Sequence, residues 1–217
     1  LGHGDFSLFS NDMKILTVSD KVEPVFQNEQ LPQELAGTEL ILSCGDLPPE
    51  YLTRLTTTLN APLYYIKGNH DIRYATKPPG GCLDIHDRIV TFNNIKILGL
   101  DGSRWYNGGP NQFTENQMKW TLWKLKPLLW WKKGVDIVIS HAPPRHVHDA
   151  EDRCHRGFKS FHPLIRRFSP SYFIHGHIHA LFNDPSERMT TINQTQVVNS
   201  YGHYLFEIDT GGSPAKK

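Results

Sequence analysis

Apolar residues along this chain occur in short runs that are separated by polar turns and a few longer amphipathic stretches. Short apolar runs rich in branched side chains are typical of strands buried on both faces of a sheet. The pattern predicts strands at Ile15–Val18, Leu40–Ser43, Leu63–Ile66, Ile95–Leu100, Ile137–Ile139, Tyr172–Ile174, Thr195–Val198 and Tyr204–Ile208.

Helical stretches lie between several of these strands, at Pro48–Leu59, Thr114–Trp131 and Ser160–Phe168. Thr114 stands where an N-cap is expected, and Gln117 follows three residues later, which is the spacing of a capping box. Strands that alternate with helices indicate an α/β fold.

The second helical stretch carries four tryptophans among several lysines: Trp120, Trp123, Trp130 and Trp131. Such a face could lie on a membrane surface or contact a partner. The rings could instead pack against the sheet while the lysines stay in solvent. We favour packing, because Pro127 is expected to interrupt the helix and shorten any amphipathic face.

Polar side chains follow five of the predicted strands closely: Asp20, Asp46, Asn69, His141 and His175. In α/β sheets, ligands bind outside the carboxyl ends of the strands. Carboxylate, amide and imidazole groups are ligands for divalent metals. The sequence therefore predicts a metal centre at one edge of a sheet.

The last of these clusters continues through Gly176 to His177 and His179. Imidazoles are costly to bury unless a partner uses their lone pairs, and a metal ion does so. The alternating spacing lets an extended segment aim His177 and His179 at adjacent ions. His175 is expected to be a core histidine rather than a ligand.

Length and charge bound the possibilities. The chain has 217 residues, with 23 basic and 22 acidic residues and a formal net charge of +1. This balance carries no strong signal for nucleic acid, and no apolar run is long enough to span a bilayer. We expect a single domain over 13–209, a flexible tail over 210–217, and a flexible segment or non-native remnant over 1–12.

The chain has three cysteines, an odd number that does not form a complete set of disulfide pairs, which predicts a reducing, cytoplasmic setting. The oligomeric state is left open.

The polar clusters, read in order, resemble the calcineurin-like metallophosphoesterase family, from about Met13 to about Tyr204. The specific motifs are Gly68-Asn69-His70-Asp71 followed by Gly176-His177-Ile178-His179. A Gly-Asp pair such as Gly45-Asp46 would by itself be weak evidence for the family. The resemblance implies the metallo-dependent phosphatase fold, a four-layer α/β/β/α sandwich of two mixed sheets.

The resemblance also implies two adjacent cation sites that share the carboxylate of Asp46. Asn69, His141 and His177 would complete one site, and Asp20 and His179 would belong to the other. We expect one or two divalent ions per chain, with Mn²⁺ favoured and Fe, Zn or Mg as alternatives.

The activity implied is hydrolysis of a phosphodiester or phosphomonoester by attack of metal-bound hydroxide. His70 would be the general acid, with Asp71 or Asp20 holding it in orientation. The substrate is expected to be small, and a diester is slightly favoured.

Two further residues are candidates for substrate binding. Arg104 follows a strand end and could grip a phosphate by its planar fork, although a structural role for that turn is slightly favoured. His155, with Gly157, lies in a long polar loop, and such loops are often functional. In related enzymes, a His-x-Gly element of this loop approaches the rim of the site.

The chain departs from the family pattern at one position. The pattern begins Asp-x-His, whereas this sequence reads Asp20-Lys21-Val22, and a valine cannot bind a cation. Asp20, Asp46 and His179 remain, which is enough for a catalytic metal held more weakly; Glu23 is a less favoured substitute ligand. The alternative is a catalytically weakened scaffold or binding protein on the same fold.

Overall fold

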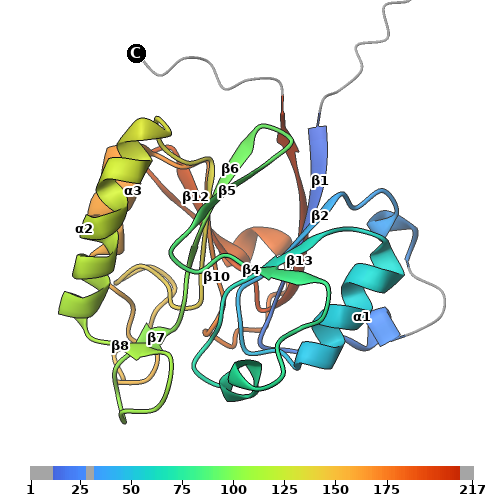
Figure 1. The fold of residues 1–217 in the computed structure, drawn as a ribbon, viewed down its shortest axis with the longest axis horizontal. Helices are drawn as coiled ribbons and strands as arrows, with labels where there is room; N and C mark the ends of the chain where they lie inside the picture. Colours follow the sequence, from blue (N-terminus) through green and yellow to red (C-terminus); the bar gives the residue numbers. More distant parts are fainter. Residues whose placement is uncertain (1–11, 28–31, 211–217) are drawn as a thin grey trace, which may run out of the picture.

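The computed structural model of the chain describes residues 12–27 and 32–210. Two β-sheets lie face to face, and helices cover the outer face of each (Figure 1). The predicted fold class, a four-layer sandwich of two mixed sheets, is confirmed. Most of the terminal segments predicted at 1–12 and 210–217 lies outside the described residues, although Asp12 belongs to the first strand.

The first sheet has five strands: β1 (Asp12–Ser19), β2 (Leu40–Ser43), β3 (Leu63–Tyr65), β4 (Cys82–Asp84) and β13 (Gly202–Asp209). Their order is β13-β1-β2-β3-β4. The strands from β1 to β4 are parallel, and β13 pairs antiparallel with β1.

The second sheet has six strands: β5 (Ile89–Phe92), β6 (Ile95–Leu100), β9 (Ile137–Ser140), β10 (Tyr172–His175), β11 (Met189–Ile192) and β12 (Thr195–Asn199). In the order β11-β12-β10-β9-β6-β5, the four central strands are parallel and the two edge strands are antiparallel. A separate short pair is formed by β7 (Ser103–Arg104) and β8 (Gln112–Phe113).

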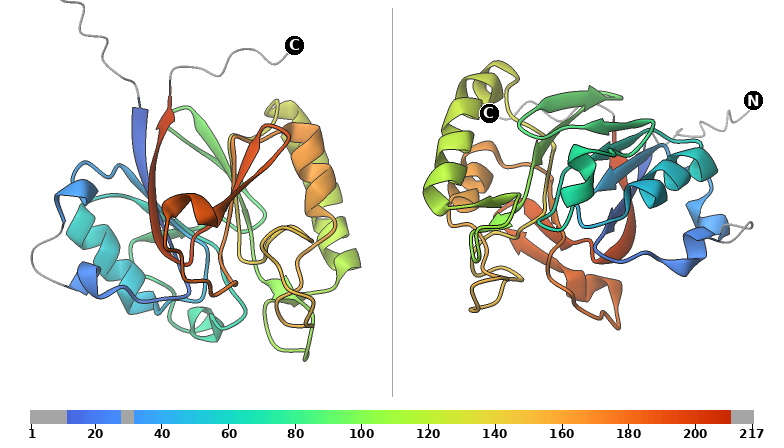
Figure 2. Two further views of the ribbon diagram at one scale, coloured as in Figure 1. Left: turned by 180° about the vertical axis from the view of Figure 1, so that it is seen from behind. Right: turned by 60° about the horizontal axis from the view of Figure 1, so that its bottom comes forward.

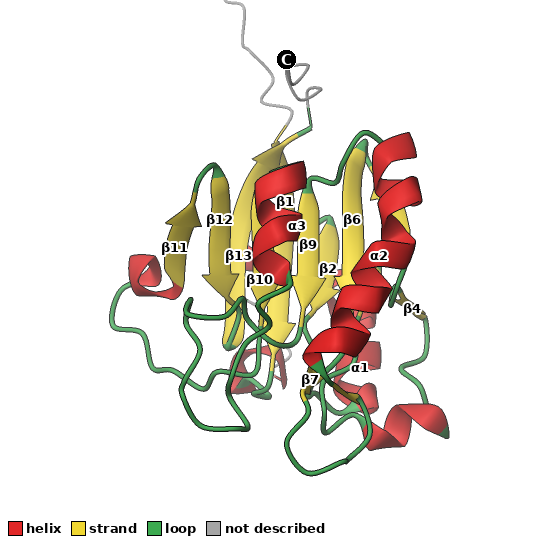
Figure 3. Cartoon of the chain, turned by 90° about the vertical axis from the view of Figure 1, so that its left-hand side faces the viewer, coloured by secondary structure: helices red, strands yellow, loops and turns green. Residues whose placement is uncertain are grey.

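The helices lie on the two outer faces. The helix α1 (Pro49–Leu59) packs on the first sheet, whereas α2 (Glu115–Trp131) and α3 (Phe161–Phe168) pack side by side on the second (Figures 1 and 3). Single 3₁₀ turns occur at Pro24–Gln27, Gln33–Leu35, Ile72–Ala75 and Pro185–Arg188.

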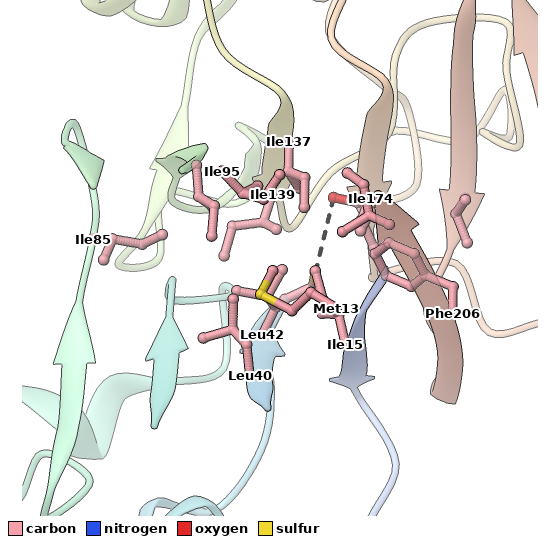
Figure 4. Packing of buried hydrophobic residues seen from close by; sticks show 14 of the residues in the cluster. Met13, Ile15, Leu40, Leu42, Ile85, Ile95, Ile137, Ile139, Ile174 and Phe206 are labelled. Atoms are coloured by element: carbon pink, nitrogen blue, oxygen red, sulfur yellow. Dashed lines mark hydrogen bonds between the residues drawn. The ribbon is translucent and has the colours of Figure 1, made fainter. Parts of the chain in front are cut away.

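Each central strand is apolar on both faces because both faces are covered. In β2, Leu40 and Leu42 enter the layer between the sheets, while Ile41 points to the α1 side. In β9, Ile137 and Ile139 enter the same layer from the opposite sheet. Figure 4 shows these side chains meeting between the sheets, which explains why the strands read as unbroken apolar runs.

The predicted strands and helices are confirmed, with bounds that differ by a few residues at most. The short strands β4, β5, β7, β8 and β11 were not predicted. None of β4, β5 and β11 contains a fully buried residue, although β5 reads Ile-Val-Thr-Phe, an apolar run typical of a strand.

Two expectations for α2 are wrong. The helix continues through Pro127 to Trp131. Pro127 lies on the exposed side, where the carbonyl that its ring leaves unpaired can reach water. The four tryptophans do not pack on the sheet: their exposed fractions run from 54% to 76%, and leucines fill the packed face.

Candidate metal centre

The parallel strands of both sheets end at one edge of the molecule, at the bottom in Figure 1 and turned forward in the right panel of Figure 2. The loops after β1, β2 and β3 come from the first sheet, and those after β9 and β10 come from the second. Backbone hydrogen bonds join neighbouring loops, from Asp20 N to Gly45 O (3.1 Å) and from Gly176 N to His141 O (3.1 Å).

The predicted ligands of one cation site, here called the first site, converge at this edge: Asp46, Asn69, His141 and His177. His141 Nε2 lies 3.2 Å from Asp46 Oδ2 and 3.1 Å from Asn69 Oδ1. Potential ligand atoms of Asp46, His141 and His177 all lie within 4.8 Å of one another. His141, Asn69 and His177 are buried. Side chains distant in the sequence thus form a compact group able to hold a cation.

Backbone contacts hold Asp46 in place. Its φ of 58° lies in the left-handed region, which a non-glycine residue rarely adopts. Asp71 Oδ2 accepts hydrogen bonds from the N–H groups of Asp46 (2.7 Å) and Gly68 (2.8 Å). The N–H of His70 donates to Asp46 Oδ1 at 2.8 Å. Asp71 therefore orients the ligand loops through their backbone.

Glycines allow the loops to approach closely. A Cβ on Gly45, whose φ is 92°, would lie 2.8 Å from Gly68 Cα. A Cβ on Gly68 would lie 2.6 Å from Asp46 Cγ. Both distances are too short for real side chains, so the absence of side chains at Gly45 and Gly68 lets the two loops pack closely.

Asp20 lies beside this group, and one of its carboxylate oxygens contacts only His179 among the described residues. Its Oδ2 accepts the His177 N–H at 2.9 Å and the Ser19 hydroxyl. Its Oδ1 is buried, has no hydrogen-bond partner, and lies 3.4 Å from Nε2 of the exposed His179. A buried carboxylate oxygen without a partner is costly in free energy. A bound cation would remove that cost, so the residues fit a metal.

The departure at Val22 has a structural counterpart. Val22 packs against the apolar cluster under α1. Lys21 Nζ lies 2.9 Å from Glu23 Oε1, so these two residues pair with each other. The structure gives no support to Glu23 as a substitute ligand, because its carboxylate is engaged by the ammonium of Lys21.

The electrostatics of the first site are dominated by one charged pair. Burial would raise the pKa of Asp46, but His141 and the His70 amide outweigh burial and lower it to about 2. Burial would lower the pKa of His141, but Asp46 raises it to about 10. Burial and the charge of His141 together lower the pKa of His177 to about 4. Without a cation, a proton on His141 compensates the buried carboxylate of Asp46.

The remaining predicted residues lie in different settings. The imidazole of His70 is exposed. His155 lies near the candidate metal centre, because its ring centroid is 5.3 Å from that of His177. Its Nδ1 lies 3.1 Å from Asp152 Oδ1. Arg104 instead bonds to Glu115 Oε2 at 2.9 Å. Its guanidinium is thus engaged by the first turn of α2, which supports the structural reading of that turn.

Two contacts at the centre were not anticipated from the sequence. Asn69 Nδ2 donates to the Tyr106 hydroxyl at 3.2 Å, and His177 Nε2 lies 2.7 Å from the carbonyl oxygen of Cys154. Tyr106 lies in a loop without a recognisable motif. Cys154 directly precedes His155, so the length of that loop and its His-x-Gly element were the available signals for it.

His175 is buried beneath the centre, as expected of a core histidine. Its Nε2 lies 2.9 Å from His148 Nδ1, and burial holds its pKa well below the usual range. It is outside the group of side chains that could share an ion among the described residues.

The three cysteines are free. Within the described residues, no helix has the length and apolar character needed to cross a membrane.

Known proteins share both the sequence pattern and the fold. The family model for calcineurin-like phosphoesterases matches residues 13–181. Human and mouse metallophosphoesterase domain-containing protein 1 are each 26% identical to this chain over 113 residues, which is 51% of this chain and 33% of those proteins. The match therefore spans about a third of the length of these relatives.

Two solved structures show the same fold. The protein TT1561 of Thermus thermophilus has a TM-score of 0.57 and 14% identity, covering 91% of this chain and 99% of that protein. A Staphylococcus aureus protein provisionally assigned as a 5′-nucleotidase, solved with α-ketoglutarate, has a TM-score of 0.50 and 13% identity, covering 89% and 50%. Because the family model matches most of the length of this chain, the chain belongs to the calcineurin-like phosphoesterase family.

Proposed function

We propose that this chain is a metal-dependent hydrolase of a phosphate ester, acting at the edge where its parallel strands end. The observation that carries the proposal is the group formed by Asp46, His141 and His177, whose potential ligand atoms lie within 4.8 Å of one another. Such a mixed carboxylate and imidazole group, with Asn69 beside it, suits divalent metals.

In this proposal, Asp46 is shared between two cations. Asn69, His141 and His177 would hold one, and Asp20 and His179 would hold the other. When bound, the cations would supply an activated water and neutralise charge on the phosphoryl oxygens. Mn²⁺ is our expected metal, because the second site offers two carboxylates and one imidazole.

His70 is the proposed general acid. Its backbone N–H is tied to Asp46 Oδ1, which holds the residue beside the shared carboxylate, while its imidazole faces solvent. From there it can donate a proton to the leaving oxygen of a bound ester. Asp71 is a positioning residue in this mechanism, since its Oδ2 accepts two backbone amides of the ligand loops.

The substrate that we propose is a small phosphate ester, with a diester slightly favoured. His155 lies at the rim beside His177 and is the candidate for substrate contact. The pairing of Arg104 with Glu115 removes the reason to assign it that role. A reducing, cytoplasmic setting is part of the proposal and rests on the odd number of cysteines in the sequence.

The proposal is tested by the hydrolysis of bis(p-nitrophenyl) phosphate with Mn²⁺, measured together with the metal content of the protein. His70→Ala is expected to lower kcat about 100-fold or more with the metal content unchanged, since it removes a proton donor and no ligand. The matched control is His146→Ala. His146 is an exposed histidine with a 3.9 Å contact to Glu151, and its loss should leave kcat within about twofold.

The rival function is that of a non-catalytic scaffold, which the replacement of a ligand histidine by Val22 favours. It predicts no hydrolysis with Mn²⁺ and no difference between the wild-type chain and His70→Ala. The metal content separates a third case, hydrolysis with a single ion per chain, from the two-ion centre.

A further inference from the structure

A groove of about 1030 Å³ lies on the outer face of the second sheet, between α2 and α3. The two helices are seen side by side there in Figure 3. Its lining includes the buried side chains of Leu122, Leu129 and Leu164, which belong to the core beneath the helices. None of the predicted metal ligands lines the groove, although Lys159 and Ser160 of its lining belong to the end of the loop between β9 and α3.

Large aromatic side chains line this groove and remain in contact with solvent. Trp120, Trp123 and Trp130 are 54%, 56% and 61% exposed. The rings of Trp120 and Trp123 stack with their centroids 4.7 Å apart. A contiguous exposed apolar patch of this kind marks an interaction site, and tryptophan is the residue most enriched at the energetic centres of interfaces.

Basic residues outnumber acidic residues around the groove. The segments 115–133 and 161–168 contain seven basic residues and one acidic residue, although the whole chain has a net charge of only +1. The one acid, Glu115, is paired with Arg104. Among the described residues that line the groove, the charged ones are Lys119, Lys126, Lys159 and Arg167.

We propose that this groove binds an acidic, amphipathic helical segment of a partner protein. Apolar side chains of the segment would enter between the tryptophans, and its carboxylates would face the lysines and the arginine. This binding mode is that of a helix in a groove. The inference is independent of the proposed hydrolysis.

The shape of the groove favours a peptide over a bilayer. The lining combines Lys126 from α2 with Arg167 from α3, so a segment lying between the helices would meet cations from both of them. The apolar floor is formed by buried side chains of the two helices, among them Leu122, Leu129 and Leu164, which a flat lipid surface would not reach. The 17 residues of α2 extend over about 25 Å, which matches several turns of a bound helix.

The first experiment is a selection from a displayed library of random peptides about as long as α2, at physiological ionic strength. The expected result is enrichment of peptides that combine Asp and Glu with Leu, Phe or Trp at helical spacing. The best peptide is then synthesised, and its affinity is measured by fluorescence anisotropy.

Two pairs of variants locate the binding. Trp120→Ala/Trp123→Ala is expected to weaken binding about tenfold or more, whereas Trp131→Ala should not. Trp131 is 76% exposed on the same helix and does not line the groove. Likewise, Lys126→Glu should weaken binding more than Lys132→Glu, because Lys132 lies outside the lining. All four variants should hydrolyse the aryl phosphodiester as the parent chain does.

The inference is overturned if no peptide is enriched or if the enriched peptides show no excess of acidic residues. Equal losses in the groove variants and their controls would overturn it as well. Tryptophan-dependent binding to phosphatidylserine-containing vesicles, with no peptide binding, would assign the face to a membrane instead.

Discussion

Single atoms decide how closely the loops of the metal centre can approach one another. At Gly176, a Cβ would lie 2.6 Å from Asp20 Oδ2 and would also overlap the hydroxyl of Ser19. Gly176 follows β10 directly, so the absence of its side chain lets the His177 loop reach the loop after β1. The contact between the two halves of the proposed site depends on this approach.

Gly176→Ala is therefore expected to displace Asp20 and weaken Mn²⁺ binding at least tenfold, because the added methyl group has no space to occupy. Isothermal titration calorimetry measures the effect. Gly80→Ala is the matched control, since its added Cβ would lie 3.6 Å from Thr53 Oγ1, an ordinary contact. Equal affinities for Mn²⁺ in the two variants would contradict this view of the centre.

Among the elements, α2 begins at a residue that a local sequence signal predicts, but a second local signal within it is misleading. Its start is set by a capping box: Gln117 N donates to Thr114 Oγ1 at 3.2 Å, and Gln117 Oε1 accepts the Thr114 N–H at 2.7 Å. The interruption expected at Pro127 does not occur, because leucines on both sides of the proline pack on the sheet. Packing of a buried face supplies more stability than one lost backbone hydrogen bond costs.

Thr114→Ala is expected to lower the free energy of unfolding by about 1 kcal/mol, since it leaves the amide of Gln117 without its cap. Urea denaturation followed by far-UV circular dichroism measures this change. Thr57→Ala provides the comparison, because Thr57 is an exposed threonine inside α1 whose hydroxyl bonds only to the Thr53 carbonyl. If Thr57→Ala destabilises the chain as much, the capping box is not the cause.

In the whole molecule, the candidate metal centre lies where the loops of the two sheets meet, at one edge of the apolar layer between them. Asp46 and Asn69 follow strands of the first sheet, whereas His141 and His177 follow strands of the second. A cation held by these residues would therefore connect the two halves of the sandwich. Any ligand that binds the folded chain and not the unfolded one raises its stability.

Addition of Mn²⁺ to chelator-treated protein is accordingly expected to raise Tm. The gain in free energy of unfolding should be about 2.7 kcal/mol when the metal is at 100 times its Kd. Differential scanning calorimetry detects the shift, and Asp46→Asn should largely abolish it. A shift of equal size in that variant would mean that the metal binds elsewhere.

The fold class and most of the helices and strands could be predicted from the sequence because the signals that specify them are local. Strands such as Leu40–Ser43 and Ile95–Leu100 are apolar on both faces, and the Thr114–Gln117 box lies within one helical turn. The order of the Asp, Asn and His clusters identified the family without coordinates. The roles of these residues in hydrolysis stay predictions.

Only the tertiary structure decided which side chains meet and which stay exposed. The contacts of Tyr106 with Asn69, of Asp71 with the amide of Asp46, and of Arg104 with Glu115 join residues that no local sequence signal relates to each other. The exposure of the α2 tryptophans has the same origin, because leucines already fill the face that packs on the sheet. Periodicity shows that a helix has an apolar side, but the space left by the rest of the chain determines which residues occupy it.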